Sequence, residues 1–166
     1  METEARARIE DIEAFRRVFN DLGAKKCREY SCKDHVFALK GWDLNRQVLK
    51  VRSKGDSSEL VYGRYDWQDG IKKQVRGFKA KVECSAEALM DMVKEWGFEQ
   101  RCVFDKRGEA ITASGYEFVI EKIDHIGWML EFEGTLDEIN QFFCEFGLKK
   151  VEKSIPKLVE EALSKQ

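Results

Sequence analysis

Charged side chains stand at every second position of the N-terminal segment, namely Glu2, Glu4, Arg6 and Arg8. The segment 130–133, Leu-Glu-Phe-Glu, repeats this spacing with Glu131 and Glu133. A β-strand sends alternate side chains to opposite faces, so each segment predicts a strand with one ionised face. A fold for this chain must place these charged faces either in water or against one another.

The same alternation continues elsewhere in the chain. In 48–52, Lys50 and Arg52 alternate with Leu49 and Val51, and in 78–83 charged residues again alternate with apolar ones. If the apolar faces pack against helices, antiparallel strands curled into a barrel would put the charged faces inside. An ordinary sheet with one solvated face gives the same pattern, so the alternation alone leaves both arrangements open.

An enclosed face of mixed charge has chemical consequences. Unpaired buried charge is too costly to keep, so acids and bases inside one barrel make sense if metal cations and a polyanion fill it. Carboxylates suit Mg²⁺ or Mn²⁺, and lysine or arginine suits phosphate oxygens.

Helical spacing of apolar residues appears in four segments, 9–22, 85–96, 135–146 and 157–163. Ser85 is a predicted helix cap, and Trp96 lies on the apolar stripe of that helix, which places it in the core. Thr135 followed by Glu138 is a capping-box signature. The last helix is expected to begin after Pro156. Further strands are expected at 60–62, 72–83, 101–107, 116–123 and 129–133, with a turn at 54–58.

Composition narrows the class of protein. The 166 residues fit one domain, 1–166, and the balance of 29 basic against 31 acidic residues argues against a general nucleic-acid affinity. Five cysteines without C-x-x-C spacing indicate reduced thiols in a cytoplasmic protein. No apolar run approaches the roughly 20 residues of a membrane helix, so we expect no membrane partner.

Five motifs, taken in order, resemble the CYTH superfamily, which includes class IV adenylyl cyclases, thiamine triphosphatases and inorganic triphosphatases. Glu2-x-Glu4-x-Arg6 is similar to the Glu-x-Glu-x-Lys signature of that family, and 49–52 is similar to its Leu-Arg-x-Arg strand. The segments 81–83, 121–133 and 154–158 resemble its acidic strand, its Gly-Leu-Gly-x-Phe-x-Glu-Ile-Glu region and its closing Ser-Tyr segment. The likeness spans essentially the whole chain and is closest to the prokaryotic cyclase-like branch.

The resemblance implies an α+β fold, an eight-stranded antiparallel β-barrel (a triphosphate tunnel) with helices packed outside. It implies a metal site for Mg²⁺ or Mn²⁺ formed by Glu2, Glu4, Glu131 and Glu133. It implies phosphate binding by Arg8, Lys50, Arg52, Lys79 and Lys106, and it places Arg6 and Glu121 as the catalytic residues. The sequence does not fix the strand register at 106–107, so Arg107 is an alternative to Lys106 in this role.

The function implied is metal-dependent cleavage of a triphosphate-bearing small molecule, such as ATP, thiamine triphosphate or inorganic polyphosphate, by an adenylyl cyclase or a triphosphatase. A homodimer is a further possibility that the relatives suggest. Two departures from the family pattern keep alternatives open, because Gly63 replaces a basic residue and Lys81 replaces an acidic one. The chain could bind a polyphosphate or nucleotide without turnover, or it could be a ligand-free scaffold.

Overall fold

Eight antiparallel strands close into one barrel in the computed structural model, which describes residues 2–55 and 57–165. The strands are β1 (Thr3–Ile9), β2 (Lys25–Ala38), β3 (Gln47–Lys54), β4 (Ser57–Gln68), β5 (Ile71–Val82), β6 (Glu99–Ala113), β7 (Tyr116–Ile123) and β8 (Gly127–Glu133). Their order around the barrel is β1-β5-β4-β3-β2-β6-β7-β8, and β8 pairs back with β1. The expected fold class is therefore confirmed.

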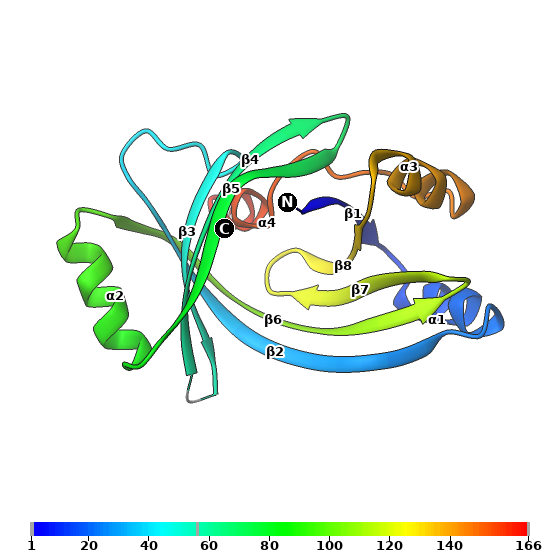
Figure 1. Ribbon diagram of the computed structural model, residues 1–166, viewed down its shortest axis with the longest axis horizontal. Helices are drawn as coiled ribbons and strands as arrows, with labels where there is room; N and C mark the ends of the chain where they lie inside the picture. The colour runs from blue at the N-terminus through cyan, green and yellow to red at the C-terminus, as the bar shows by residue number, and fades with distance from the viewer. Residues whose placement is uncertain (1, 56, 166) are drawn as a thin grey trace.

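Four helices accompany the barrel, namely α1 (Ile12–Asp21), α2 (Ala86–Glu95), α3 (Leu136–Glu145) and α4 (Ile155–Leu163). Helices α1 and α3 lie together at one end of the molecule, and α2 lies at the opposite end (Figure 1). None of the helices within the described residues is long and apolar enough to cross a membrane.

The register between β1 and β8 decides which way their side chains point. Glu4 lies opposite Glu133, and Arg6 lies opposite Glu131. Ala5 and Ala7, which alternate with them, are buried in the apolar cluster beneath α1 and α3. The two strands whose charges alternate in the sequence are therefore neighbours, and their charged faces turn into the barrel.

Apolar residues on the outer strand faces are buried against helices at both ends of the molecule. Phe19 of α1 and Phe142 of α3 belong to one cluster with the outer faces of β1, β7 and β8. Leu89 of α2 belongs to another with Leu49 and Val51 of β3. Each such side chain stabilises the fold by roughly 1.5–3 kcal/mol. Where the outward strand faces pack against helices they are apolar, and the charged faces of these strands turn to the interior.

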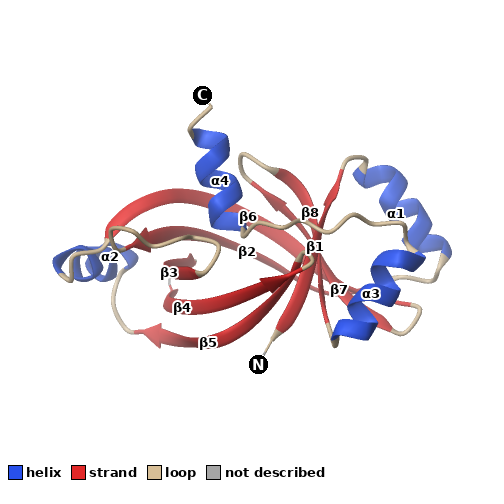
Figure 2. Ribbon diagram, turned by 90° about the horizontal axis from the view of Figure 1, so that it is seen from above, coloured by secondary structure: helices blue, strands red, loops and turns tan. Residues whose placement is uncertain are grey.

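Helix α4 packs differently from the other three helices. Its Ile155 and Val159 contact inward-facing apolar side chains of the barrel, including Val36, Val48 and Phe104. Figure 2 shows α4 beside β2 and β6, away from the layer formed by α1 and α3. Helix α4 therefore covers an apolar part of the barrel interior.

Two sequence predictions about the helices were wrong. Helix α4 begins at Ile155, before Pro156, because Ser154 caps it and proline is accommodated in the first turn, where no intrahelical N–H donor is needed. Trp96 is 55% exposed, and of the expected stripe on α2 only Leu89 and Val93 are buried. The helix contacts the sheet along a narrower face than its sequence indicates.

Three residues covered by the sequence predictions lie outside the described range. They are Met1 and Gln166, at the ends of the expected domain, and Asp56, in the expected turn.

The inward-facing Gly108 allows a test of how closely the barrel interior is packed. A methyl group at Gly108 would lie 2.8 Å from the Tyr30 hydroxyl and 2.9 Å from the Ile120 carbonyl oxygen. Since that carbonyl belongs to the neighbouring strand, we expect Gly108→Ala to lower the free energy of unfolding by about 1–3 kcal/mol in urea denaturation. Gly134→Ala is the control, because the nearest atoms to its methyl would be side-chain atoms of Glu138 and Phe132 at 3.2 Å. Equal losses in the two variants would contradict the close approach at Gly108.

Candidate functional site

Four basic side chains from four strands converge on a narrow cavity of ≈ 40 Å³ inside the barrel, and they are Arg6, Lys50, Lys72 and Lys106. Asp34 of β2, Tyr65 of β4 and Ser154, which caps α4, are its other polar lining residues. Ile155 and Pro156 of α4 line it as well, so the helix that covers the apolar part of the interior also closes this cavity on one side. The barrel thus concentrates positive charge around a small enclosed space.

Asp34 is the carboxylate that holds two of the predicted phosphate-binding residues. The Arg52 guanidinium donates to both its oxygens, from Nε at 2.6 Å and from a terminal nitrogen at 2.8 Å, and the Lys50 ammonium lies 3.4 Å away. Burial would raise the pKa of Asp34, but the charges of Lys50 and Arg52 outweigh it and hold the pKa well below its ordinary value. Two cations therefore share one ionised acid.

Lys50 is buried beside other cations. Burial lowers the pKa of Lys50 to about 8, and the neighbouring charges of Arg52 and Lys106 act in the same direction against the attraction of Asp34. Its ammonium is therefore poised to lose its proton close to neutral pH unless an anion joins it.

Glu121 lies on β7, away from Asp34 and Lys50 on β2 and β3, and is 1% exposed. One of its oxygens, Oε2, accepts hydrogen bonds from Lys106 at 2.8 Å and from the Tyr30 hydroxyl at 2.5 Å. Burial alone would raise the pKa of Glu121, but Lys106 and Arg6 lower it. Its other oxygen, Oε1, is buried without a hydrogen-bond partner among the described residues. Glu121 is thus an ionised, oriented carboxylate with one free acceptor.

Glu4 and Arg6 connect the cationic cavity to a group of acids. Glu4 lies 2.6 Å from the Arg6 guanidinium and 2.5 Å from the Lys72 ammonium, and Arg6 also pairs with Glu131. Burial opposes ionisation of Glu4, but Arg6 and Lys72 lower its pKa to about 2. The signature segment at the N-terminus therefore contributes both signs of charge to one network.

Glu2, Glu4 and Glu133 form an acidic cluster whose carboxylate oxygens all lie within 4.8 Å of one another. Burial raises the pKa of Glu133, and the nearby charges of Glu4 and Glu2 raise it further. Oxygen ligands of one Mg²⁺ ion lie roughly 4 Å apart or less, so a small inward movement would bring the three carboxylates to bonding distance. The donor set and the repulsion among its members fit a hard divalent cation. Glu131, the fourth predicted ligand, is paired with Arg6 instead.

Two predicted phosphate-binding residues lie away from the cavity. Arg8 is exposed and donates to the carbonyl oxygen of Ile126 at 3.0 Å. The side chain of Lys79 is 52% exposed and lies 3.5 Å from Glu59. The structure thus brings together Arg6, Lys50, Arg52, Lys106 and Glu121, and it places the other two cations outside this group.

Lys72 is an interior residue that the sequence pattern missed, because alternation along β5 puts its side chain on the outer face. The register between β4 and β5 changes after Arg64, which pairs with Arg76, because Tyr65 pairs with Gln74 and Val75 is left as an extra residue. A one-residue bulge reverses the faces of every residue beyond it, and so Lys72 points inward. Gly77, within the same strand, was the available sequence signal, since glycine inside a strand often marks a bulge.

Tyr65 positions this lysine. The Lys72 ammonium lies 4.2 Å from the centre of the Tyr65 ring. The Tyr65 hydroxyl occupies the space above Gly63, where a side chain would otherwise stand. The glycine at this position therefore makes room for the aromatic ring that contacts the Lys72 ammonium.

A scan against protein-family models found no match, and a search of curated proteins found none either.

Solved structures, in contrast, share this fold over nearly the whole chain. A protein of Pyrococcus horikoshii matches with a TM-score of 0.77 and 22% identity, covering 98% of this chain and 99% of that one. A candidate adenylate cyclase of Vibrio parahaemolyticus matches with a TM-score of 0.69 and 14% identity, covering 98% and 97% of the two chains. A candidate adenylyl cyclase of Hippeastrum, described as having a dominant triphosphatase activity, matches with a TM-score of 0.61 and 14% identity, covering 93% and 91%. The resemblance to the CYTH superfamily is thus confirmed as a likeness of fold.

Proposed function

We propose that this chain binds a triphosphate-bearing small molecule inside its barrel and cleaves it with the help of Mg²⁺ or Mn²⁺. The observation that carries the proposal is the convergence of four basic side chains inside the barrel, which Glu4 links directly to the acidic cluster; they are Arg6, Lys50, Lys72 and Lys106. A polyphosphate is the ligand class whose charge balances several buried cations, and its oxygens also bind hard metal ions. The candidate cyclases with the same fold, one of them with triphosphatase activity, support this assignment.

The residues divide into two groups. Glu2, Glu4 and Glu133, with Glu131 beside them, would hold the metal, which would neutralise negative charge on phosphate oxygens. Lys50, Arg52, Lys72 and Lys106 would bind and orient the phosphate chain. Arg6 lies between the two groups and would stabilise charge that develops on the bridging oxygen of the broken bond.

Glu121 is suited to act on the nucleophile. Its Oε2 is held by Lys106 and Tyr30, so its free Oε1 has a defined direction in the interior. An ionised carboxylate in this position would orient a water molecule or a ribose hydroxyl by accepting its proton in a hydrogen bond. The nucleophile bound there distinguishes a triphosphatase from an adenylyl cyclase.

A second function is favoured by the ion pairs themselves. Glu4 and Glu131 are both engaged by basic side chains, which compete with a metal for the same oxygens. A barrel that binds a polyphosphate or a nucleotide without cleaving it would need only the cationic cavity. Turnover assays separate this alternative from the enzyme.

Thermal denaturation with inorganic triphosphate and with ATP, each with and without Mg²⁺, tests the proposed function. A ligand that binds only the folded protein raises the melting temperature, so we expect the largest rise with triphosphate and metal together. Glu133→Gln should remove most of the metal-dependent part of the rise, whereas the control Glu10→Gln, an exposed residue outside the cluster, should leave it unchanged. Release of phosphate from ATP would indicate a triphosphatase, and cyclic AMP with pyrophosphate a cyclase. The absence of any shift would refute binding, and binding without products would support the second function.

The pKa of Lys50 predicts how triphosphate affinity depends on pH. Because the pKa of Lys50 is lowered to about 8, its ammonium is charged below that pH and neutral above it. We expect triphosphate binding, measured by titration calorimetry at constant ionic strength, to weaken as the pH rises through about 8. Lys50→Arg keeps its charge over this range and should remove that step. A wild-type profile identical to that of Lys50→Arg would contradict the role of Lys50.

Two adjacent lysines of β5, Lys72 and Lys73, provide a matched pair of variants. They test whether the lysine that the Val75 bulge turns inward contributes to triphosphate binding. Lys72→Met removes a cation from the cavity and should weaken triphosphate binding about tenfold to a hundredfold, since hydrogen bonds to charged groups contribute about 1.5–3 kcal/mol. Lys73→Met makes the same change at an exposed neighbour that faces the other way and should have little effect. Equal losses in the two variants would show that Lys72 acts only through net charge.

A further inference from the structure

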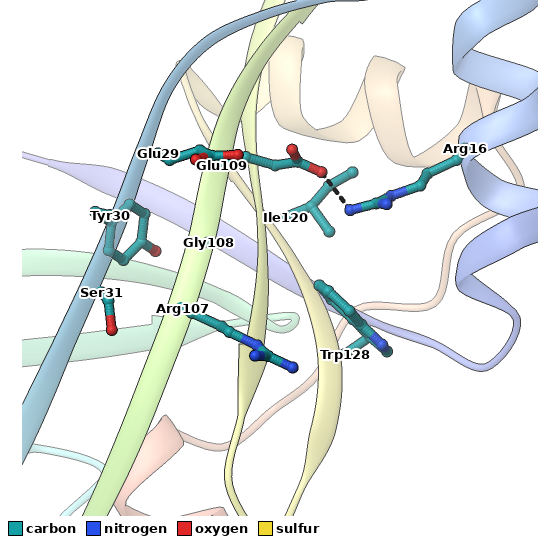
Figure 3. A pocket seen from close by; sticks show the side chains of 9 residues that line it. All are labelled: Arg16, Glu29, Tyr30, Ser31, Arg107, Gly108, Glu109, Ile120 and Trp128. Atoms are coloured by element: carbon teal, nitrogen blue, oxygen red, sulfur yellow. Dashed lines mark hydrogen bonds and ion pairs between the residues drawn. The ribbon is translucent and has the colours of Figure 1, made fainter.

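A second cavity, of ≈ 520 Å³, lies on the outer face of the barrel, and of the residues placed in the proposed cleavage site only Tyr30, which holds Glu121, also lines it. Arg16 of α1 reaches toward it from one side, and Arg107 of β6 extends toward Trp128 of β8 from the other (Figure 3). Its volume falls within the range of small-molecule sites, which is about 300–1,000 Å³.

The strand register assembles part of this surface as one row across four strands. Ser31 of β2 lies opposite Arg107, Arg107 lies opposite Lys122 of β7, and Lys122 lies opposite Trp128. Residues directly opposite one another on the same face of a sheet are in contact distance. A hydroxyl, two cations and an indole ring therefore stand side by side on the outer surface.

On this surface the acidic residues have ion-pair partners, whereas the basic pair Arg107 and Lys122 has none among the described residues. Glu29 and Glu109 also lie directly opposite each other, but Lys26 pairs with both, and Arg16 lies 2.6 Å from Glu109. In the described part of the chain, no carboxylate lies within ion-pair distance of Arg107 or Lys122. Like charges directly opposite each other are unfavourable, so this basic pair is the part of the surface where an anion would be stabilising.

Trp128 supplies the apolar side of the cavity. The Arg16 guanidinium lies 5.6 Å and the Lys122 ammonium 6.0 Å from the centre of its ring. The indole is partly exposed and lines the cavity together with Ile120. An aromatic ring beside Arg107 and Lys122, which have no carboxylate partner among the described residues, is a suitable surface for a flat ring that carries a negative group.

We propose that this outer cavity binds a small aromatic phosphate of the nucleoside monophosphate class. The ring stacks on Trp128, the phosphate contacts Arg107 and Lys122, and Ser31 and Glu29 offer polar atoms to hydroxyl or amino groups of the ligand. The site is separate from the barrel interior, because alternate residues of β6 face opposite sides, with Lys106 inside and Arg107 outside.

Titration calorimetry with AMP, in the presence of saturating inorganic triphosphate and without a divalent metal so that the triphosphate occupies the interior without being cleaved, tests this proposal. We expect one AMP per chain to bind under these conditions, more tightly than adenosine or inorganic phosphate alone. Arg107→Gln should weaken AMP binding about tenfold or more, as loss of a charge-assisted contact does. Trp128→Leu should weaken AMP about tenfold and inorganic phosphate much less, as loss of a stacking surface does.

Arg76→Gln is the matched control. Like Arg107, Arg76 lies opposite another basic residue, in this case Arg64, on an exposed part of β4 and β5. This substitution should leave AMP affinity unchanged. Complete displacement of AMP by inorganic triphosphate, equal losses in Arg107→Gln and Arg76→Gln, or no AMP binding would each overturn the proposal. If triphosphate does not bind, AMP binding that depends on Arg107 would still support the outer site, so the two proposals fail separately.

Discussion

The balance of charge inside a closed barrel is the constraint on which the rest of this structure depends. The outer faces of β1, β3, β7 and β8 carry apolar residues that pack against helices, so the charged faces of β1, β3 and β8 turn to the interior. Burying one ion without a partner costs several kcal/mol, and the interior therefore pairs its basic residues with Glu4, Asp34, Glu121 and Glu131. These close pairs between carboxylates and basic side chains offset the cost of burying so many charges inside the barrel.

This balance is uneven along the interior, and the unevenness suggests a function. Cations outnumber acids around the small cavity, where Lys50 has a lowered pKa, whereas Glu2, Glu4 and Glu133 gather beside it, where Glu133 has a raised pKa. Each group is stabilised by ligands of opposite sign. A polyphosphate with a divalent cation would satisfy both groups at once, and the same ion pairs keep the barrel stable without them.

The sequence predicted much of the candidate site because strand parity is a local property. Arg6 and Lys50 face the interior as strand parity predicted, since each lies in a regular strand whose alternate residues are buried under helices. Glu121 also faces the interior, but its place in the site was implied by the family resemblance. Arg8 and Lys79 share the predicted parity, but they lie where the strands run toward solvent and do not reach the cavity. Parity fixes the face of a residue and leaves its depth undetermined.

The sequence by itself predicted the four helices and seven of the eight strands in their order, with β2 missing, and it predicted that one face of β1, of β3 and of β8 is charged. Only the tertiary structure decided that Lys72 turns inward at the Val75 bulge, that Glu131 pairs with Arg6, and that α4 closes one side of the cavity. The physical reason is that bulges, ion pairs and helix docking depend on contacts between segments far apart in the chain. Hydrophobic periodicity reports only which face of each segment is buried.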